Sequence, residues 1–305
     1  MAAPHLVWLP FAAEDLGDPP DGLQIETYEG GEPPGSVERV EFFVPSYDIG
    51  LDVSVLLPRM RNLRVVQTQT AGVDNVEPYV PAGVTLCNAR GVHDASTAEL
   101  AMGLVLASLR GIPDFALAQT DGRWLHGVRP ALADRSVLIV GYGSIGAALE
   151  RRLDGFECEI VRVARRARDG VHGWQDLPGL LGSADVVVLM VPLDDSTRRL
   201  VDDGFLARMK DGALLVNVAR GGVVDTEALV AECATGRLTA AVDVTDPEPL
   251  PPEHPLWTTP GVLVSPHVGG ATSAMKPRVT RLVEEQLVRF AAGTPLANVV
   301  GAGRS

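Results

Sequence analysis

The segment from residue 137 to 146 constrains the fold more than any other stretch of the chain. Its first four residues, 137 to 140, are apolar and mostly β-branched, which predicts a strand buried on both faces of a sheet. The strand runs directly into Gly141, Gly143 and Gly146, which have the spacing of a dinucleotide-binding turn. In such a turn the first glycine makes a tight bend, the second lets a pyrophosphate approach, and the third lets the next helix pack closely. The segment therefore predicts a strand, turn and helix that bind a dinucleotide.

The overall composition narrows the class of protein. A chain of 305 residues is long enough for two domains, and 46% hydrophobic residues are typical of a globular protein. A net charge of −13 argues against nucleic acid or an anionic membrane as the main partner. The cysteines Cys87, Cys158 and Cys233 are widely spaced, which predicts free thiols and no metal site. Because the N-terminus has no basic signal and no segment is long and apolar enough to span a bilayer, we expect a cytoplasmic protein.

Apolar runs separated by polar loops predict strands that alternate with helices. In the first part of the chain the expected strands are 5–10, 40–44, 63–68 and 84–87. After residue 136 they are 137–140, 160–164, 186–191, 214–218, 240–244 and 262–264. The expected helices are 96–110, 145–153, 227–235 and 276–290, and the first of them opens with the capping-box spacing of Ser96 and Glu99. This alternation is typical of doubly wound parallel sheets.

The last expected helix determines the domain organisation. No strand follows it, so we expect it to pack back against the N-terminal sheet. The prediction is an α/β protein with two doubly wound parallel-sheet domains. Residues 1–95 and 275–305 form one discontinuous domain, and residues 96–274 form the dinucleotide-binding domain inserted in it.

Polar residues follow several of the expected strands of the second domain. Arg220, Glu248 and His267 each come shortly after a strand, and ligands of open parallel sheets bind at the carboxyl ends of strands. Singly, they could be a solvated loop arginine, an exposed glutamate among prolines and a histidine cap. Together, in a chain with a dinucleotide turn, they indicate an active site. In the first domain Ala71 and Gly72 are either an ordinary turn or a pair of N–H donors for an anion.

Four motifs in this order resemble those of a known family: 140–146, 217–225, 243–250 and 265–270, with weaker matches at 71–74, 97–99 and 190–193. The chain resembles the D-isomer-specific 2-hydroxyacid dehydrogenases, and within them the glyoxylate and hydroxypyruvate reductases. The resemblance implies a Rossmann nucleotide domain inserted in a flavodoxin-like substrate domain. It also implies an NAD(P)-dependent oxidoreductase that transfers hydride between its cofactor and a small 2-oxoacid or D-2-hydroxyacid.

The resemblance also implies a role for each catalytic residue. Arg220 binds the carboxylate and carbonyl oxygen of the substrate through its planar donor fork. His267 is the acid and base that moves a proton to or from the carbonyl oxygen, and Glu248 orients it and favours its protonated form. The implied substrate-binding residues of the first domain are Ala71, Gly72, Ser46 and Tyr47.

The implied cofactor site includes the glycine turn and residues that follow other strands. Its expected members are Gly141, Gly143, Ser144, Ile145, Gly146, Thr97, Arg165, Arg166, Arg168, Pro192, Thr197, Ala219 and Asp243, the last near the nicotinamide. An NAD site usually has an acidic residue about 20 positions after the turn. Here the strand ends in three arginines, with no acid before Asp169, which predicts NADP, with NAD as the alternative. The alternative explanation of the arginines is a solvated basic loop in an otherwise acidic protein.

The substrate and partners follow from the same comparison. No basic cluster lies near Ser46 or Ala71 in the sequence, which disfavours a phosphorylated substrate and favours glyoxylate or hydroxypyruvate. The resemblance implies a homodimer formed through the nucleotide domain. Two alternatives remain: a non-catalytic regulator that binds NAD(P)H on the same scaffold, and a dehydrogenase of the formate or phosphite type.

Overall fold

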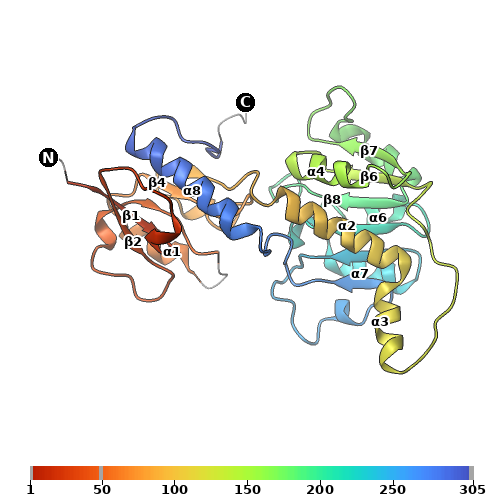
Figure 1. Ribbon diagram of the computed structural model, residues 1–305. Helices are drawn as coiled ribbons and strands as arrows, with labels where there is room; N and C mark the ends of the chain where they lie inside the picture. Colours follow the sequence, from red (N-terminus) through yellow and green to blue (C-terminus); the bar gives the residue numbers. More distant parts are fainter. Residues whose placement is uncertain (1–2, 48–50, 302–305) are drawn as a thin grey trace. The chain divides into compact units, whose positions relative to one another are not determined.

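The computed structural model describes residues 3–47 and 51–301. The chain forms two compact units, shown in Figure 1. Unit 1 consists of residues 1–93 and 273–305, and unit 2 consists of residues 94–272. Each unit is built around one parallel sheet, so the prediction of two doubly wound parallel-sheet α/β domains is confirmed.

The sheet of unit 1 has the strand order of flavodoxin-like folds. Its strands are β1 (His5–Leu9), β2 (Leu23–Thr27), β3 (Val40–Phe43), β4 (Val65–Gln67) and β5 (Thr85–Cys87), in the order β2-β1-β3-β4-β5. Every pairing is parallel. Strand β2 is absent from the sequence prediction because it lies at the sheet edge, where none of its residues is fully buried.

Helices cover the sheet of unit 1 and bury both of its faces. Successive residues of a strand point to opposite faces, so Leu6 packs in one apolar cluster and Val7 in the other. The first cluster includes helix α1 (Val53–Leu56). The second includes helix α8 (Met275–Ala291), whose apolar face contributes Val279, Leu282, Val283, Leu287 and Phe290. The C-terminal helix therefore belongs to the core of the N-terminal sheet.

The sheet of unit 2 contains the glycine turn. Its strands are β6 (Ser136–Val140), β7 (Glu159–Val163), β8 (Val186–Leu189), β9 (Leu214–Asn217), β10 (Thr239–Val242) and β11 (Val262–Val264). Their order is β11-β10-β9-β8-β6-β7, and all pairings are parallel. The chain moves outward from β6 to β7 and then crosses to β8 on the other side of β6. The strand order therefore reverses between β6 and β8, where ligands of this fold class bind.

The helices of unit 2 are α2 (Asp94–Arg110), α3 (Ile112–Thr120), α4 (Ser144–Leu153), α5 (Leu177–Leu180), α6 (Asp203–Arg208) and α7 (Thr226–Ala234). Helix α2 begins at Asp94, so the predicted capping role of Ser96 is wrong. The Ser96 hydroxyl lies 2.9 Å from that of Thr272 instead. Helix α3 is also absent from the sequence prediction. It begins directly after Gly111, and Pro113 stands in its first turn, where a missing N–H is tolerated.

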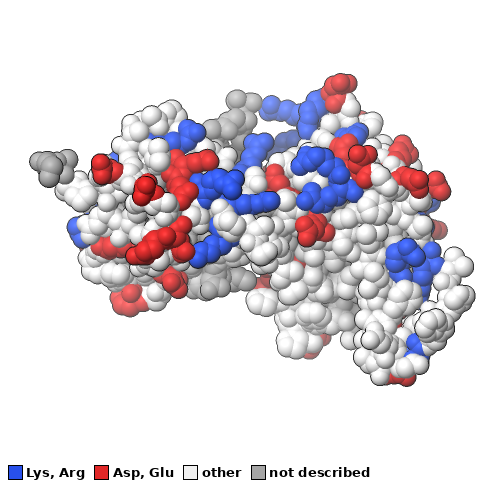
Figure 2. Space-filling view, in the orientation of Figure 1, with Lys and Arg blue, Asp and Glu red and all other residues white. Residues whose placement is uncertain are grey.

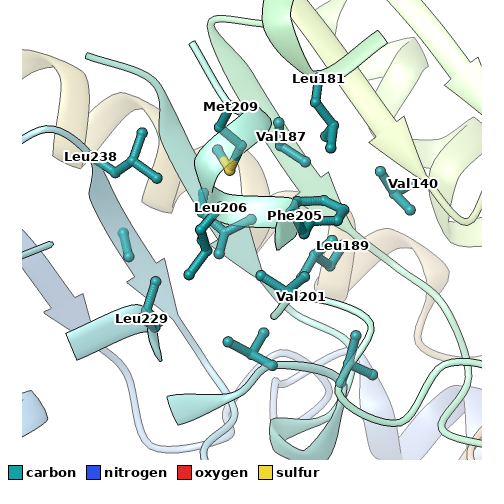
Figure 3. Packing of buried hydrophobic residues seen from close by; sticks show 14 of the residues in the cluster. Val140, Leu181, Val187, Leu189, Val201, Phe205, Leu206, Met209, Leu229 and Leu238 are labelled. Atoms are coloured by element: carbon teal, nitrogen blue, oxygen red, sulfur yellow. The ribbon is translucent and has the colours of Figure 1, made fainter. Parts of the chain in front are cut away.

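The strands of unit 2 are buried on both faces. Val186 and Val188 of β8 pack against one side, with residues of α2 and α4, whereas Val187 and Leu189 pack against the other. Figure 3 shows the second cluster, in which Phe205 and Leu206 of α6 lie close to the β8 side chains. This two-sided core holds the strand ends that carry the candidate site.

No single helix of the described chain is long and apolar enough to cross a membrane. The helices α2 and α3 pass the same test of length and composition only as a pair, bent by 65°. Most of the apolar residues of α2 pack inside unit 2.

Candidate functional site

The glycine turn follows β6 and packs directly on the neighbouring strand. Gly141 has a positive φ of 102°, and a Cβ at this position would lie 2.6 Å from the backbone carbonyl of Met190, directly after β8. A Cβ on Gly146 would lie 3.2 Å from the carbonyl oxygen of Gly141. Residues with a side chain would therefore separate β6 from β8 and α4 from the turn. Gly141 and Gly146 therefore allow the turn to pack tightly against β8 and α4.

The space beside the turn fits a pyrophosphate. A Cβ on Gly143 would have no atom within 4 Å, so this backbone faces open space. Gly143 is also the N-cap of α4, and no side chain caps the helix. The first N–H groups of a helix have no partner within the helix, so those of Ser144 and Ile145 are available to a phosphate group. The described residues at this turn thus fit the dinucleotide that the sequence predicts.

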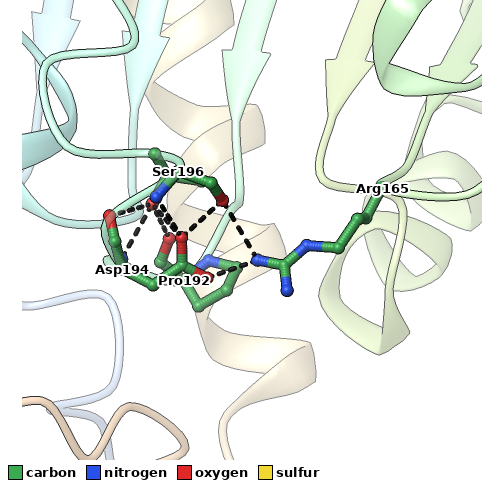
Figure 4. Close-up of polar contacts among 5 residues, drawn as sticks. Arg165, Pro192, Asp194 and Ser196 are labelled. Carbon is green, nitrogen blue, oxygen red and sulfur yellow. Dashed lines mark hydrogen bonds and ion pairs between the residues drawn. The ribbon is translucent and has the colours of Figure 1, made fainter. Parts of the chain in front are cut away.

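The arginines after β7 make contacts across the same region. Arg165 forms an ion pair with Asp194 and lies 3.3 Å from the hydroxyl of Ser196, both in the loop after β8 (Figure 4). Arg168 donates to the carbonyl oxygen of Tyr142 in the glycine turn at 2.7 Å. Arg166 lies in the same loop as these two arginines. Figure 2 shows Lys and Arg side chains gathered over α4 on this face of unit 2, with Asp and Glu side chains beside them toward β7.

Asp194 is charged in this arrangement. Its partial burial raises the pKa, but hydrogen bonds from Ser196 and Arg165 outweigh that effect and lower the pKa of the carboxyl to about 2. Thr197 accepts a hydrogen bond from the Asp194 backbone N–H at 2.8 Å and donates to the carbonyl of Pro192 at 2.6 Å. Thr197 therefore stabilises the loop after β8 in this structure.

The loops after β9 and β10 are in direct backbone contact. A Cβ on Gly221 would lie 1.9 Å from the carbonyl oxygen of Thr245, so only glycine permits this approach. The buried side chain of Asn217 accepts from the Ala219 N–H and donates to the Arg220 carbonyl, both at 3.0 Å. These contacts hold the Arg220 loop beside the loop that leads to Glu248.

Glu248 and His267 form a hydrogen-bonded pair. The Nδ1 atom of the His267 ring contacts Oε1 of Glu248. Burial raises the pKa of Glu248, but the hydrogen bond and electrostatic attraction of His267, then a backbone hydrogen bond at Thr245 and, least, the charge of Arg220 outweigh it, so the net pKa is lowered. Glu248 is therefore an ionised partner for His267, and the other ring nitrogen, Nε2, is free of this bond. Of the three residues predicted at the strand ends, Glu248 and His267 are in direct contact, and Arg220 acts on Glu248 through its charge.

Asp243 holds the loop that carries His267. Its side chain is 2% exposed and accepts hydrogen bonds from the Ser265 hydroxyl at 2.6 Å and from the N–H groups of Val268 and Gly269 at 2.9 and 2.8 Å. Its carbonyl accepts from the His267 N–H at 2.7 Å. Thr97 of α2 also contacts this loop, with its hydroxyl 3.4 Å from the Gly269 carbonyl. The buried carboxylate therefore fixes the position of His267.

In unit 1 the loop after β4 has its carbonyl groups bound by side chains. The hydroxyl of Thr68 donates to the carbonyl of Thr70 at 2.9 Å, and the hydroxyl of Thr70 to that of Gly72 at 2.6 Å. The side chain of Asn88 donates to the carbonyl of Ala71 at 2.9 Å. Within the described chain, the N–H groups of Ala71 and Gly72 have no partner. The loop thus has the pair of free donors that an anion requires.

Ser46 and Tyr47 lie after β3, at the same edge of the sheet as the Ala71 loop. The ring of Tyr47 lies 5.8 Å from the ring of His93, which directly precedes α2. The sequence analysis does not single out His93, because one histidine after a glycine and a valine has no motif. Its contact with Gln69, 24 positions away, appears only in the fold.

Comparison with known proteins shows which family this chain is similar to. A family model described as D-isomer specific 2-hydroxyacid dehydrogenase, NAD binding domain, matches residues 102–269. Glyoxylate reductase from Thermofilum pendens is 34% identical over 249 residues, which cover 76% of this chain and 73% of the relative. D-3-phosphoglycerate dehydrogenase from Archaeoglobus fulgidus is 31% identical over 296 residues. That match covers 92% of this chain but only 55% of the longer relative.

A solved structure is similar over nearly the whole chain. It is a D-isomer specific 2-hydroxyacid dehydrogenase from Xanthobacter autotrophicus Py2 in complex with NADPH and MES. The two chains superpose with a TM-score of 0.81 at 32% sequence identity, and the match covers 99% of each.

Two glycine substitutions separate the packing of the turn from its binding role. We expect Gly141→Ala to lower the thermal midpoint of unit 2, because its Cβ would overlap the Met190 backbone. We expect Gly143→Ala to leave the midpoint unchanged but to weaken dinucleotide binding about tenfold or more, because its methyl group would occupy the space of the pyrophosphate. Differential scanning fluorimetry and calorimetric titration measure the two effects. Unchanged binding by Gly143→Ala would contradict this assignment.

Proposed function

The chain belongs to the D-isomer-specific 2-hydroxyacid dehydrogenases, a family of NAD(P)-dependent oxidoreductases, and from this premise we propose that it reduces a small 2-oxoacid to a D-2-hydroxyacid. The observation that carries the proposal is the contact of Glu248 with His267, beside the charge of Arg220. An ionised carboxylate, an imidazole and a guanidinium are the groups that carbonyl reduction requires for proton transfer and substrate binding.

The proton is delivered by His267. A bound reduced nicotinamide supplies the hydride. Glu248 accepts a hydrogen bond from Nδ1 and stabilises the imidazolium, so that Nε2 can donate its proton to the carbonyl oxygen of the substrate. In the reverse direction the neutral ring accepts the hydroxyl proton. Asp243 contributes by holding the His267 loop, in addition to its expected position near the nicotinamide.

Arg220 binds the substrate through two parallel hydrogen bonds, to the carboxylate and to the carbonyl oxygen. Ala71 and Gly72 of unit 1 donate their backbone N–H groups to the carboxylate. The free state of these donors, in a loop whose carbonyls are bound by side chains, supports this role. Ser46 and Tyr47 contact the rest of the substrate.

The proposed reaction is tested by the oxidation of NADPH and NADH with glyoxylate, hydroxypyruvate and pyruvate. We expect turnover with at least one of them. In His267→Ala we expect kcat to fall about a hundredfold or more, with cofactor affinity unchanged, because only the proton donor is lost. His172→Ala, an exposed histidine of the same unit, is the matched control and should behave as the parent. If the parent protein binds NADPH tightly but reduces none of these acids, the result would favour the alternative of a non-catalytic regulator that binds NAD(P)H.

We propose NADP as the preferred cofactor. The loop after β7 presents three arginines where an NAD site has a carboxylate, and the similar enzyme from Xanthobacter autotrophicus was solved with NADPH. Arg165 forms an ion pair with Asp194 in this structure. A 2′-phosphate therefore has to replace Asp194 as the partner of Arg165. On this proposal Asp194 moderates the preference for NADP that the arginines create.

Two substitutions test this competition in opposite directions. Arg165→Ala should lower the ratio of kcat/KM for NADPH over NADH about tenfold or more, because it removes a charge-assisted hydrogen bond to the phosphate. Asp194→Asn should raise the same ratio, because Asn can still accept the hydrogen bonds of the loop but does not compete as a charge. Arg151→Ala on the exposed side of α4 is the control and should leave the ratio unchanged. A parent enzyme that prefers NADH would contradict the proposal.

We further propose that the protein is a cytoplasmic homodimer joined through unit 2. Helix α3 and the loop after it expose apolar side chains, namely Ile112, Leu117, Trp124 and Val128. The loop is held against α3, because Arg129 pairs with Asp114 at 3.2 Å and lies over the ring of Phe115. In Figure 2 this end of unit 2 bears few charged side chains. A preformed apolar surface of this kind suits a second copy of the chain. The three cysteines are free thiols, the form that the cytoplasm maintains.

The dimer is tested by the mass of the protein in solution. We expect twice the chain mass of 32.3 kDa for the parent and a single chain mass for the double variant Trp124→Glu, Val128→Glu. Two buried charges without partners would oppose association. Val55→Glu, at an exposed apolar residue of unit 1, is the control and should remain dimeric. If sedimentation velocity shows that the parent protein is a monomer, the proposal of a homodimer is wrong.

A further inference from the structure

Three loops of unit 1 are joined at the carboxyl ends of β3, β4 and β5. Gln69, after β4, is the residue that joins them. Its side chain donates to the carbonyl of Pro45, after β3, at 2.8 Å. Its backbone carbonyl accepts from Nε2 of His93, which lies in the segment after β5, at 2.6 Å. The loops that carry Ser46 and His93 are therefore attached to the residue two positions before Ala71.

At this edge two buried polar atoms have no partner among the described residues: Oγ of Ser46 and Nδ1 of His93. His93 is 6% exposed, so its ring has little contact with bulk water. A carbonyl oxygen only accepts, so Nε2 of His93 must carry the hydrogen of its bond to Gln69. In the neutral ring Nδ1 is then a bare acceptor. Buried polar groups without a partner are costly in a folded protein, and they mark places where a ligand atom or an ordered water completes the bonding.

We propose that Nδ1 of His93 and Oγ of Ser46 bind a hydroxyl group on carbon 3 of the substrate. This inference rests on the proposed 2-oxoacid reduction, and it makes these two residues determinants of substrate choice. The Tyr47 ring, directly after Ser46 and 5.8 Å from the His93 ring, forms an apolar wall beside them. The adjacent donors of Ala71 and Gly72 hold the carboxylate of the same small molecule.

A hydroxyl group matches the two unpartnered atoms. It donates its hydrogen to Nδ1 of His93 and accepts one from the Ser46 hydroxyl. An analogue in which hydrogen replaces this hydroxyl, so that carbon 3 is a methyl group, would leave both atoms without partners. A site built to bind a hydroxyl rejects such an analogue strongly. The preferred substrates are therefore 2-oxoacids with a hydroxyl on carbon 3, such as hydroxypyruvate, over their alkyl analogues, such as pyruvate.

The variant His93→Gln isolates the role of Nδ1. The glutamine amide can still donate to the carbonyl of Gln69, but it has no acceptor at the position of Nδ1. We expect kcat/KM for hydroxypyruvate to fall about tenfold or more, while the value for pyruvate changes less than about threefold. Ser46→Ala should likewise lower the ratio of kcat/KM for hydroxypyruvate to kcat/KM for pyruvate. Ser108→Ala, at another buried hydroxyl without a partner, lies in α2 of unit 2 and should leave the ratio unchanged.

Binding to His93 is also measured without turnover. The ¹⁵N resonance of its Nδ1, identified by its loss in His93→Gln, should shift when hydroxypyruvate is added to the protein with NADP⁺, and should not shift with pyruvate. Equal losses of kcat/KM for both acids, or no shift with hydroxypyruvate, would overturn the inference. If no 2-oxoacid is turned over, the reductase proposal fails by itself, and the resonance still decides whether His93 binds the hydroxyl.

Discussion

Close contact between backbone segments at two glycines holds together the loops of unit 2 that carry the candidate site. Gly141 lies against the backbone after β8, and Gly221 lies against the backbone after β10. A side chain at either position would overlap a carbonyl group that cannot move without its strand. Because these contacts join loops that follow different strands, they bring the glycine turn to the strand-order reversal and Arg220 to the Glu248 loop. The glycine turn and the loops of Arg220 and Glu248 thus share one edge of the sheet.

A buried negative charge organises the remaining loop of that edge. The His267 backbone has a φ of 51°, a left-handed conformation that is unfavourable for residues other than glycine. The carboxylate and the carbonyl of Asp243 receive four hydrogen bonds from this loop and offset that cost. Glu248 then orients the imidazole from the other side. The position of His267 therefore depends on the buried side chain of Asp243 as well as on Glu248.

In unit 1, hydrogen bonds from uncharged side chains hold the loop after β4. Side-chain donors bind the carbonyls of residues 70 to 72, so the N–H groups of Ala71 and Gly72 are left for an anion. Gln69 attaches the neighbouring loops, and with them Ser46 and His93. The side chains that make these contacts, those of Thr68, Thr70, Asn88 and Gln69, are uncharged.

The parallel-sheet class, most strand positions and the glycine turn could be predicted from the sequence, because they depend on local periodicity and on motifs of adjacent residues. The contact of Glu248 with His267 agrees with the site prediction, but the catalytic roles of Arg220, Glu248 and His267 stay predictions. The sequence prediction missed β2, which has no buried run, and α3, whose start looked only like the end of α2. The ion pair of Asp194 with Arg165 and the contact of His93 with Gln69 could be seen only in the folded protein. Both contacts join residues more than 20 positions apart, and their geometry depends on how the strands are ordered and packed, which no local pattern contains.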